Sequence, residues 1–213
     1  MVNIGVIAWK GGVGKTFIAS HLVWGLAELG EKVLGIDLDN QGDLMKWMTG
    51  YTWKKQSDVK VSESITLLWR PGGEIQLPNG YGYAVFDGRP QVDISADILN
   101  MLDVAFIPIA GRLSQENARD LSSLQREMSP DTKMFLLANF IEMRLYITRE
   151  EALISKKVGI PILDMGIPKT VKVRESEMTG RPVWEMSYAN RGKVPAVLKS
   201  LCFFIQQGEW EKL

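Results

Sequence analysis

The sequence predicts an α/β fold in which a mostly parallel twisted sheet is flanked by helices on both faces, as one domain over residues 1–213. Two observations lead to this prediction. Short apolar runs alternate with helical patterns along the chain, as they do in parallel sheets with crossover helices. The first 39 residues read as strand, glycine-rich loop, helix and strand, which is one βαβ unit. The length suits a single sizeable core.

The first unit contains three regular segments. The β-branched run NIGVIAW, residues 3–9, predicts a strand, and residues 15–30 predict a helix. Four apolar residues recur at helical spacing in that helix: Ile18, Leu22, Leu26 and Leu29. Gly30 stands where a helix C-cap is expected. KVLGIDLD, residues 32–39, predicts a second, buried strand.

Later apolar runs predict the other strands, and amphipathic stretches predict the helices between them. The strand-like runs are YAVFD (83–87), VAFIPIA (104–110), MFLLANF (134–140) and IPILDMGI (160–167). The helical patterns are SQENARDLSSLQREM (114–128) and TREEALISKKV (148–158). Residues 50–81 are rich in Gly, Lys, Pro and Ser, and they are compatible with a short edge strand at 65–69 or a hairpin within 71–80.

Composition excludes several classes of protein. Lys and Arg number 25 and so do Asp and Glu, so a basic surface for nucleic acid or membrane must be local. The single cysteine, Cys202, cannot form an intrachain disulfide or a metal cluster, and we interpret it as a core residue in a reducing compartment. The sequence shows neither a leader nor an apolar stretch near the roughly 18 residues of a membrane span. We therefore expect a cytoplasmic protein.

AWKGGVGKT, residues 8–16, contains the pattern of a phosphate-binding loop. Glycines that follow a strand let backbone N–H groups point inward around phosphates, and the next helix adds its positive N-terminus. Lys15 is predicted to reach the terminal phosphates, and the Thr16 hydroxyl to ligate Mg²⁺. The alternative is a glycine-rich turn without a ligand, and the strand-loop-helix context favours the phosphate loop.

The loop departs from the usual fingerprint, because Trp9 stands where glycine is required and Lys10 adds a second lysine. KGGxGK[ST] resembles the deviant Walker A box of the ParA/MinD family of P-loop ATPases. The resemblance implies ATP and Mg²⁺ as cofactors, and a homodimer that sandwiches two ATP molecules. It implies a catalytic role for Lys15 and for Lys10, the latter acting on the partner's nucleotide. The nucleotide-binding residues that it implies here are Lys10, Gly11, Gly12, Val13, Gly14, Lys15, Thr16 and Phe17.

GIDLDNQGDL, residues 35–44, resembles the D-x-D-P-Q-G segment of the family, with Asn40 in place of the proline. Carboxylates two residues apart at a strand end point to opposite sides, so separate tasks are expected. The resemblance implies that Asp37 supports the Mg²⁺ shell through water and that Asp39 orients or activates the attacking water. A helix N-cap or an Asx-turn is the structural alternative for such a pair.

YGYAVFDGRP, residues 81–90, ends a strand in Asp87, which fits a Walker B carboxylate that holds the metal through water. Aspartate is common at the end of an apolar strand, so this motif is weak on its own. In the family Thr or Ala and then Pro usually follow, and here Gly88 and Arg89 precede Pro90. Arg89 either contacts phosphate or faces solvent.

Residues 167–193, IPKTVKVRESEMTGRPVWEMSYANRGK, align without a gap on the pattern of partition ATPases. The matching positions are Ile167, Pro168, Lys169, Lys172, Glu175, Gly180, Arg181, Pro182, Arg191 and Gly192. NFIEMR, residues 139–144, is similar to the preceding segment of the family, where Arg144 matches. The resemblance implies that adenine lies near Asn139 and Pro168. It is best to the small partition ATPases that lack an N-terminal DNA-reading domain.

Residues 165–199 carry seven Lys or Arg against three Glu in a chain that is neutral overall. The basic residues are Lys169, Lys172, Arg174, Arg181, Arg191, Lys193 and Lys199. A solvated face is the usual meaning of such a cluster. The resemblance implies instead that it binds DNA without regard to sequence, through phosphate contacts. Lys172 and Arg191 fall on positions with that role, and Lys169, Arg174 and Lys193 are candidates beside them.

The resemblance implies a DNA-segregation ATPase that associates with the nucleoid and has no membrane partner. A small centromere-binding, ParB-type protein would stimulate its hydrolysis and release it from DNA. The alternative is a MinD-like or other cargo-positioning switch that acts at a membrane or on another scaffold. MinD-type chains end in a basic amphipathic helix, whereas residues 194–213 close with Glu209 and Glu211 and show the apolar face of a helix docked on the sheet. His21 is interpreted as a packing or surface residue, and three tryptophans as core or interface aromatics: Trp24, Trp47 and Trp184.

Overall fold

The computed structural model describes residues 1–8, 11–72, 75–90, 96–110, 121–126, 128–141, 155–186 and 192–213. Its strands are β1 (Val2–Ala8), β2 (Val33–Asp37), β3 (Asp58–Lys60), β4 (Ile65–Trp69), β5 (Tyr83–Pro90), β6 (Val104–Ala110), β7 (Lys133–Ile141) and β8 (Ile162–Pro168). Its helices are α1 (Lys15–Glu28), α2 (Asp43–Met48), α3 (Ala96–Met101), α6 (Lys172–Thr179) and α7 (Lys193–Gln206). Two 3₁₀ turns are η1 (Val183–Glu185) and η3 (Glu209–Lys212).

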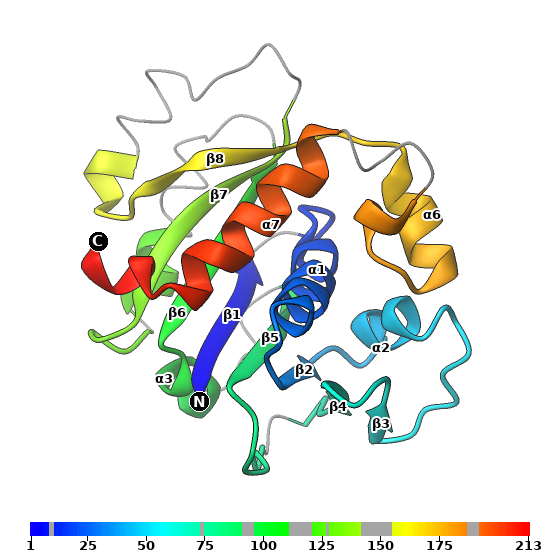
Figure 1. The fold of residues 1–213 in the computed structure, drawn as a ribbon. Helices are drawn as coiled ribbons and strands as arrows, with labels where there is room; N and C mark the ends of the chain where they lie inside the picture. The colour runs from blue at the N-terminus through cyan, green and yellow to red at the C-terminus, as the bar shows by residue number, and fades with distance from the viewer. Residues whose placement is uncertain are drawn as a thin grey trace.

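One eight-stranded sheet runs through the structure in the order β3-β4-β2-β5-β1-β6-β7-β8 (Figure 1). All neighbouring strands are parallel except β3 and β4, which are antiparallel. The predicted strands all form, and the predicted fold class is confirmed. The carboxyl ends of the parallel strands meet at one edge of the sheet, where α/β proteins place their ligands.

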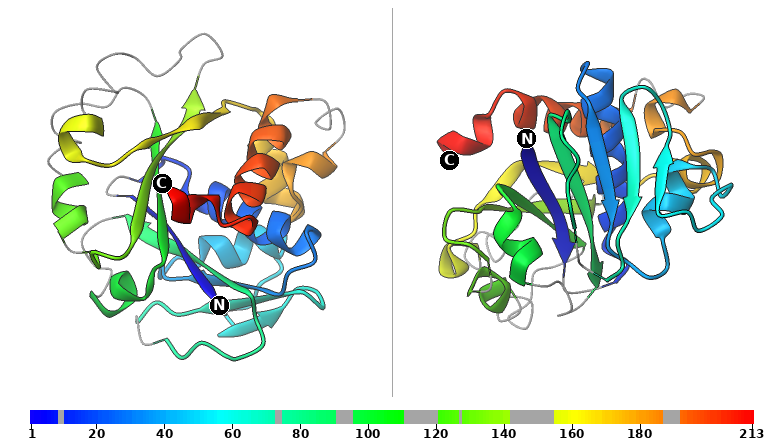
Figure 2. Two further views of the ribbon diagram at one scale, coloured as in Figure 1. Left: turned by 60° about the vertical axis from the view of Figure 1, so that its left-hand side comes forward. Right: turned by 90° about the horizontal axis from the view of Figure 1, so that it is seen from below.

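Side chains alternate between two apolar layers along each central strand. Val85 of β5 belongs to the layer beneath α1, α2 and α7, whereas Ala84 and Phe86 belong to the layer beneath α3 and the helical segments 121–126 and 155–158. Figure 2 shows α1 and α7 on one face of the sheet and α3 on the other. Parallel strands are covered on both faces in this way because their crossover helices lie there.

Helix α1 is buried on nearly all sides, since residues 17–26 are all buried. Of the predicted apolar positions, Ile18, Leu22 and Leu26 lie in the core and Leu29 is partly buried against it. Gly30 has φ +91°, which fits the predicted C-cap. His21 lies in the middle of this helix and is fully buried. Its Nδ1 donates to the Phe17 carbonyl at 2.6 Å, and its Nε2 accepts from the Val183 N–H at 3.0 Å. His21 is therefore a packing residue that fastens α1 to η1, and burial lowers its pKa to about 3.

The region 50–81 agrees only in part with its two predicted forms. Residues 65–69 do form a strand, β4, but it is not at the edge, because β3 pairs antiparallel with its outer side. An ion pair of 2.7 Å between Arg70 and Asp58 holds β3 beside the end of β4. In the described residues 75–80 there is no strand and hence no hairpin. Of the helical patterns at 114–128 and 148–158, residues 121–126 and 155–158 are described and are helical. The Met128 N–H donates to the Leu124 carbonyl at 3.1 Å at the end of the first.

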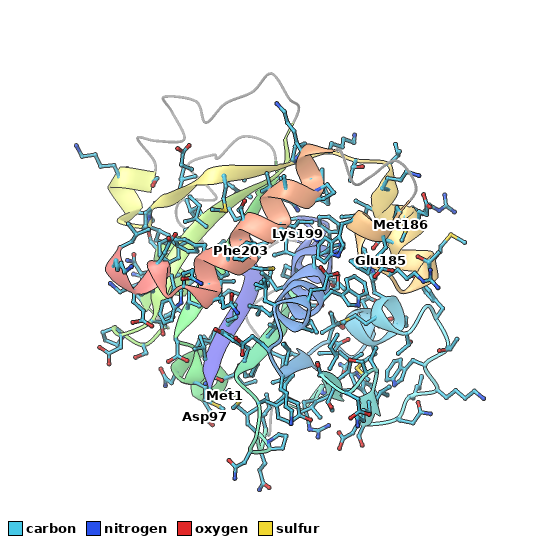
Figure 3. All side chains as sticks on the ribbon, in the orientation of Figure 1. Met1, Asp97, Glu185, Met186, Lys199 and Phe203 are labelled. Atoms are coloured by element: carbon cyan, nitrogen blue, oxygen red, sulfur yellow. The ribbon has the colours of Figure 1, made fainter. Side chains whose placement is uncertain are left out.

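The C-terminal helix α7 docks on the sheet and α1, as its apolar pattern predicts. Leu198, Leu201 and Ile205 are buried there, whereas Lys199 and Phe203 lie on its outer face (Figure 3). Trp24, Trp47 and Trp184 are buried in the same layer, which confirms the core interpretation. Within the described parts of the chain, no helix has both the length and the apolar character needed to cross a membrane.

Candidate functional site

The glycine-rich loop connects the carboxyl end of β1 to α1. Gly14 has φ +91°, and a Cβ at this position would collide with the amide nitrogen of Asn139, so both backbone conformation and space require glycine. The Asn139 Nδ2 group donates to the Val13 carbonyl at 2.8 Å. Asn139 lies in β7, so the loop is tied to a strand on the other side of β6. Its Oδ1 has no hydrogen-bond partner among the described residues.

Lys15 is the first residue of α1, and its side chain is almost completely buried. Burial is the main cause that lowers its pKa, and the charges of Asp87, Asp39 and Asp43 oppose that shift. The ammonium group therefore lies in an acidic surrounding at the positive end of a helix. A cation and a helix N-terminus together favour a bound anion such as a phosphate.

Asp87 lies on β5 beside this loop and is almost fully buried. The Thr16 hydroxyl donates to its Oδ2 at 2.7 Å. Its Oδ1 is buried and has no hydrogen-bond partner in the described part of the chain. Burial raises the pKa of Asp87 well above its usual value, and the neighbouring Asp37 adds to the shift. An orphaned carboxylate oxygen in such a place is costly unless a cation compensates it.

Asp37 is the last residue of β2 and lies directly opposite Asp87 in the parallel register of β2 and β5. It is fully buried, and it accepts hydrogen bonds from the Asp39 N–H at 2.9 Å and the Met45 N–H at 3.1 Å. Burial raises its pKa to about 6, and these backbone bonds oppose the rise. Met45 lies in the first turn of α2, so Asp37 satisfies one of the free N–H groups of that helix, although the N-cap residue is Gly42 and not one of the two aspartates.

Asp39 lies just beyond the strand and is partly exposed. Its Oδ1 accepts from the Gln41 N–H at 2.8 Å, which is the Asx-turn of the structural alternative. Its carbonyl accepts from the Trp69 indole N–H at 2.8 Å. No sequence motif pointed to Trp69, because a tryptophan that ends an apolar strand is usually a packing residue. The structure thus adds Trp69 to the site.

Mg²⁺ prefers oxygen ligands and commonly binds to one or two carboxylates, with water and phosphate in its other positions. Thr16, Asp37 and Asp87 provide one hydroxyl and two adjacent buried carboxylates, one of which has an orphaned oxygen. These residues fit the predicted metal. The described residues contain no group of three or more His, Cys, Asp or Glu that could hold a metal alone. Such an ion would therefore depend on oxygens from nucleotide and water.

The remaining predicted nucleotide residues differ in their placement. The Phe17 side chain is buried against His21, Trp47 and Phe140, so only its backbone is available to a nucleotide. Pro168 is buried at the end of β8, beside β7. Some predicted residues lie outside the described part of the structure: Trp9, Lys10, Arg144 and Arg191. The same holds for the side chain of Arg89.

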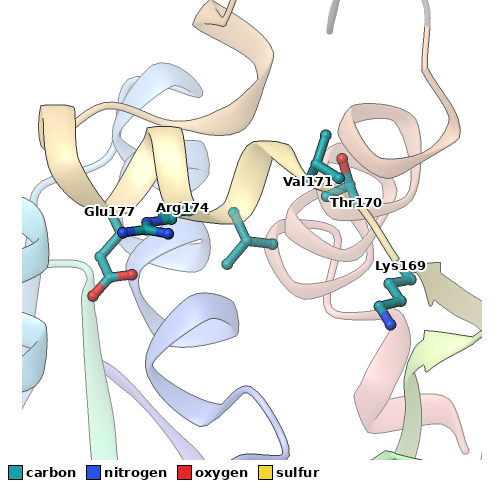
Figure 4. A pocket seen from close by; sticks show the side chains of 6 residues that line it. Lys169, Thr170, Val171, Arg174 and Glu177 are labelled. Atoms are coloured by element: carbon teal, nitrogen blue, oxygen red, sulfur yellow. The ribbon is translucent and has the colours of Figure 1, made fainter.

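The predicted basic surface lies around α6 and the start of α7. Lys169 and Arg174 are exposed and line an open depression of about 600 Å³ together with Val171 and Glu177 (Figure 4). Lys172 is partly buried and forms an ion pair of 2.5 Å with Glu175 on its own helix. Lys193 is exposed at the start of α7. Lys169, Arg174 and Lys193 have no ion pair with any residue that the structure describes.

Comparisons with known proteins agree with this geometry. The chain is 26% identical over 199 residues to the maintenance of carboxysome distribution protein A of Halothiobacillus neapolitanus, and the match covers 89% of both chains. Its fold is similar to a ParA family ATPase of Chlorobium tepidum, with a TM-score of 0.71, 18% identity, and 96% and 98% of the two chains covered. It is also similar to the septum site-determining protein MinD of Pyrococcus horikoshii complexed with Mg-ADP, with a TM-score of 0.72, 17% identity, and 96% and 95% covered.

A family match covers the loop, both buried aspartates and most of the sheet. Residues 4–183 match the family described as the CobQ/CobB/MinD/ParA nucleotide binding domain. The matched segment runs from β1 through α6 to the start of η1, so it contains most of the site assembled above. The chain belongs to the CobQ/CobB/MinD/ParA family of nucleotide-binding domains.

Proposed function

We propose that the chain is an ATP-dependent molecular switch, a DNA-partition ATPase whose ATP-bound dimer binds DNA without regard to sequence. One observation carries the nucleotide part of the proposal. Asp37 and Asp87 lie side by side and buried at the strand ends, next to Lys15 and Thr16 of the glycine loop. Such a cluster of opposite charges at a helix N-terminus suits a metal-bound triphosphate.

Each residue at the loop has a separate task in this proposal. Backbone N–H groups from Gly11 to Phe17 cradle the phosphates, and Lys15 contacts the terminal ones. Thr16, Asp37 and Asp87 hold Mg²⁺, which when bound neutralises charge that builds up on the transferred phosphoryl group. Asn139 and Pro168 lie beside the adenine, where the unpartnered Asn139 oxygen can accept a hydrogen bond.

Hydrolysis requires two further groups. Asp39 is partly exposed beyond the buried pair, so its second carboxylate oxygen can orient the attacking water. Lys10 acts on the nucleotide of the partner protomer, which makes charge stabilisation depend on dimerisation. The protein thus hydrolyses ATP only after it has assembled into the dimer that binds DNA.

The exposed cations around α6 support the DNA part of the proposal. Lys169, Arg174 and Lys193 can contact phosphates directly, and Lys172 can do so once it leaves Glu175. We also propose Arg191 as a contact. The single domain of residues 1–213 binds the nucleoid as a dimer, because two protomers double the number of phosphate contacts and so raise the affinity for DNA. A small centromere-binding protein then stimulates hydrolysis and releases it.

A second candidate function is the positioning of another cargo by the same switch. It is favoured by the relative from Halothiobacillus neapolitanus, which is named for carboxysome distribution and matches over 89% of both chains. Both candidates share the nucleotide site. They differ in what the ATP-bound dimer binds, which is DNA in the first and a membrane or another scaffold in the second.

The purified protein tests both the ATPase and the DNA-binding parts of the proposal. Phosphate release is measured with ATP and Mg²⁺, with and without duplex DNA, and filter binding is measured on two unrelated duplexes with an ATP analogue or ADP. We expect slow hydrolysis and similar binding to both duplexes only with the analogue. Binding to anionic vesicles instead of DNA would contradict the DNA proposal. Loss of plasmid inheritance in a deletion strain separates DNA partition from transport of another cargo.

A further inference from the structure

The segment from Asp37 to Gly42 connects the buried metal carboxylate to α2 and carries Asp39 between them. Three hydrogen bonds within the segment shape it: Asp39 N–H to Asp37 Oδ1, Gln41 N–H to Asp39 Oδ1, and Gly42 N–H to the Asp39 carbonyl. All three join residues two or three positions apart. They define a turn, but they do not fix where the turn lies relative to the sheet.

The Trp69 indole supplies a side-chain contact that comes from a neighbouring strand. Trp69 is the last residue of β4 and lies opposite Asp37 in the parallel register of β2 and β4. Its Nε1 donates to the Asp39 carbonyl at 2.8 Å, thirty residues away in sequence. The Asp39 carbonyl therefore accepts two bonds, one from the turn at 3.1 Å and one from the sheet.

A second tryptophan holds the Trp69 ring in place. The Trp53 ring meets the Trp69 ring edge to face, with centroids 5.1 Å apart. Trp53 also packs so closely on Gly42 that a Cβ there would collide with its ring. Its own N–H is used elsewhere, on the Gln56 carbonyl at 2.9 Å. The two indoles therefore cover the turn from outside, and only Trp69 bonds to it.

The rigidity of this turn matters because Asn40 follows Asp39 directly. Proline at this position would fix its own φ and restrict the residue before it, whereas asparagine does neither. A restraint on the Asp39 backbone must then come from another part of the fold. The bond from Trp69 lies on the residue that needs that restraint.

We infer that Trp69 is a positioning residue for hydrolysis, whose indole N–H holds the Asp39 backbone so that the carboxylate faces the attacking water. This inference rests on the proposed ATPase function. Loss of the bond removes no hydrogen bond that Thr16, Asp37 or Asp87 itself makes. It lets the Asp39 turn move by fractions of an ångström, which is enough to slow a reaction that depends on orientation.

Trp69→Phe tests the inference, because it removes the N–H and keeps an aromatic ring against Trp53. Trp184→Phe is the matched control: it removes an indole N–H bond to Glu28, in the layer between α1 and α7. Two quantities are measured for each protein. One is the pair of kinetic constants for ATP hydrolysis, kcat and KM, determined separately. The other is hydrogen exchange at the Gln41 and Gly42 amides without nucleotide.

We expect kcat of Trp69→Phe to fall about tenfold while KM stays within about threefold. Exchange at the two turn amides should accelerate by a similar factor, because their protection reflects local opening of the turn. Trp184→Phe should match the wild type in both measurements. This pattern would support a positioning role.

Other outcomes overturn the inference. Unchanged kcat and unchanged exchange in Trp69→Phe would show that the bond positions nothing, and equal losses in both variants would show general destabilisation. A fall in kcat without faster exchange would also contradict it. If the wild type hydrolyses no ATP, the proposed function fails, and exchange in Trp69→Phe then separately reports whether the indole holds the turn.

Discussion

The two lysines of the glycine loop differ in what they can reach. Lys15 is buried among Asp87, Asp39 and Asp43 at the start of α1, so we expect it to contact the nucleotide of its own protomer. Lys10 lies outside the described residues, and its role on the partner's nucleotide remains a prediction from the motif. The division of labour between them can be tested by removing each charge separately.

Lys15→Ala should lose ATP binding, because it removes a cation that is buried at the start of α1, where the phosphates are proposed to bind. Lys10→Ala should keep ATP binding but lose dimerisation or turnover with ATP, because its target lies across the interface. Isothermal titration measures the first effect, and sedimentation with a non-hydrolysable analogue measures the second. A Lys10→Ala protein that dimerises and hydrolyses like the wild type would contradict the proposed action on the partner.

His21 makes stability depend on pH. Burial lowers its folded pKa to about 3, whereas in the unfolded chain it has the ordinary value of about 6.5. As pH falls below 6.5, His21 becomes protonated in the unfolded state, whereas in the folded state it stays neutral down to about pH 3. The group therefore costs about 1.4 kcal/mol of unfolding free energy for each pH unit in that window.

Asp37 acts in the opposite direction, because its folded pKa of about 6 lies above its ordinary value. The folded state binds that proton more readily, so stability rises as pH falls from about 6 toward 4. Burial also raises the pKa of Asp87, which adds to this effect. The histidine contribution must therefore be measured as a difference between two proteins.

His21→Gln provides that difference, since glutamine can still donate to Phe17 and accept from Val183. We expect wild type to be more stable than His21→Gln above pH 6.5, with the gap narrowing by about 1.4 kcal/mol per pH unit down to pH 4.5. Urea unfolding at several pH values measures the gap. Parallel stability curves for the two proteins would show that His21 does not titrate on unfolding.

Among the elements, α2 joins the nucleotide site to the basic surface. Its first turn donates a hydrogen bond to Asp37, and its end packs against the end of α6. The Trp47 indole N–H donates to Ser176 Oγ of α6 at 3.4 Å. The backbones at Gly50 and Gly180 meet so closely that a Cβ on Gly180 would lie 2.5 Å from the Gly50 nitrogen. Both ends of α2 are thus fixed by residues of proposed functional sites.

Gly180→Ala should be more destabilising than Gly208→Ala. Both glycines have left-handed φ, +65° and +63°, so each alanine carries a similar backbone cost of about 1 kcal/mol. The new methyl group at position 208 meets only ordinary contacts, whereas at 180 it strikes the Gly50 backbone. We expect a further loss of about 1–3 kcal/mol from overpacking. Equal urea midpoints for Gly180→Ala and Gly208→Ala would show that α2 and α6 can move apart at Gly180 without loss of stability.

Much of this architecture can be predicted from the sequence, because strands of a parallel sheet are buried on both faces and read as apolar runs. The glycine loop and Asp87 follow from local motifs at strand ends. Trp69 and β3 could not be predicted in this way. They depend on which strands are neighbours, and β4 lies next to β2 only through long-range pairing. Short edge strands such as β3 also carry little apolar pattern.

At the scale of the whole molecule, charge is neutral in sum but uneven in place. Lys169 and Arg174 lie exposed near one end of the sheet, and Val171 between them is 89% exposed. Lys172 is engaged with Glu175, so on this surface the two exposed cations are the better first targets. Lys156 and Lys157 are also exposed, but they lie in the segment that covers the other face of the sheet. They provide a control with the same change in net charge.

Lys169→Ala/Arg174→Ala should weaken DNA binding equally for unrelated sequences and flatten its salt dependence. Each phosphate contact adds about 0.9 to the negative slope of log K against log salt, so a dimer that loses four contacts should lose about 3.6. Filter binding across a salt series with an ATP analogue measures the slope. ATP binding and dimerisation should be unchanged, because neither residue lies at the loop. Lys156→Ala/Lys157→Ala should keep the wild-type slope. If both double variants lower the slope alike, DNA responds to net charge alone, and the α6 surface is not its binding site.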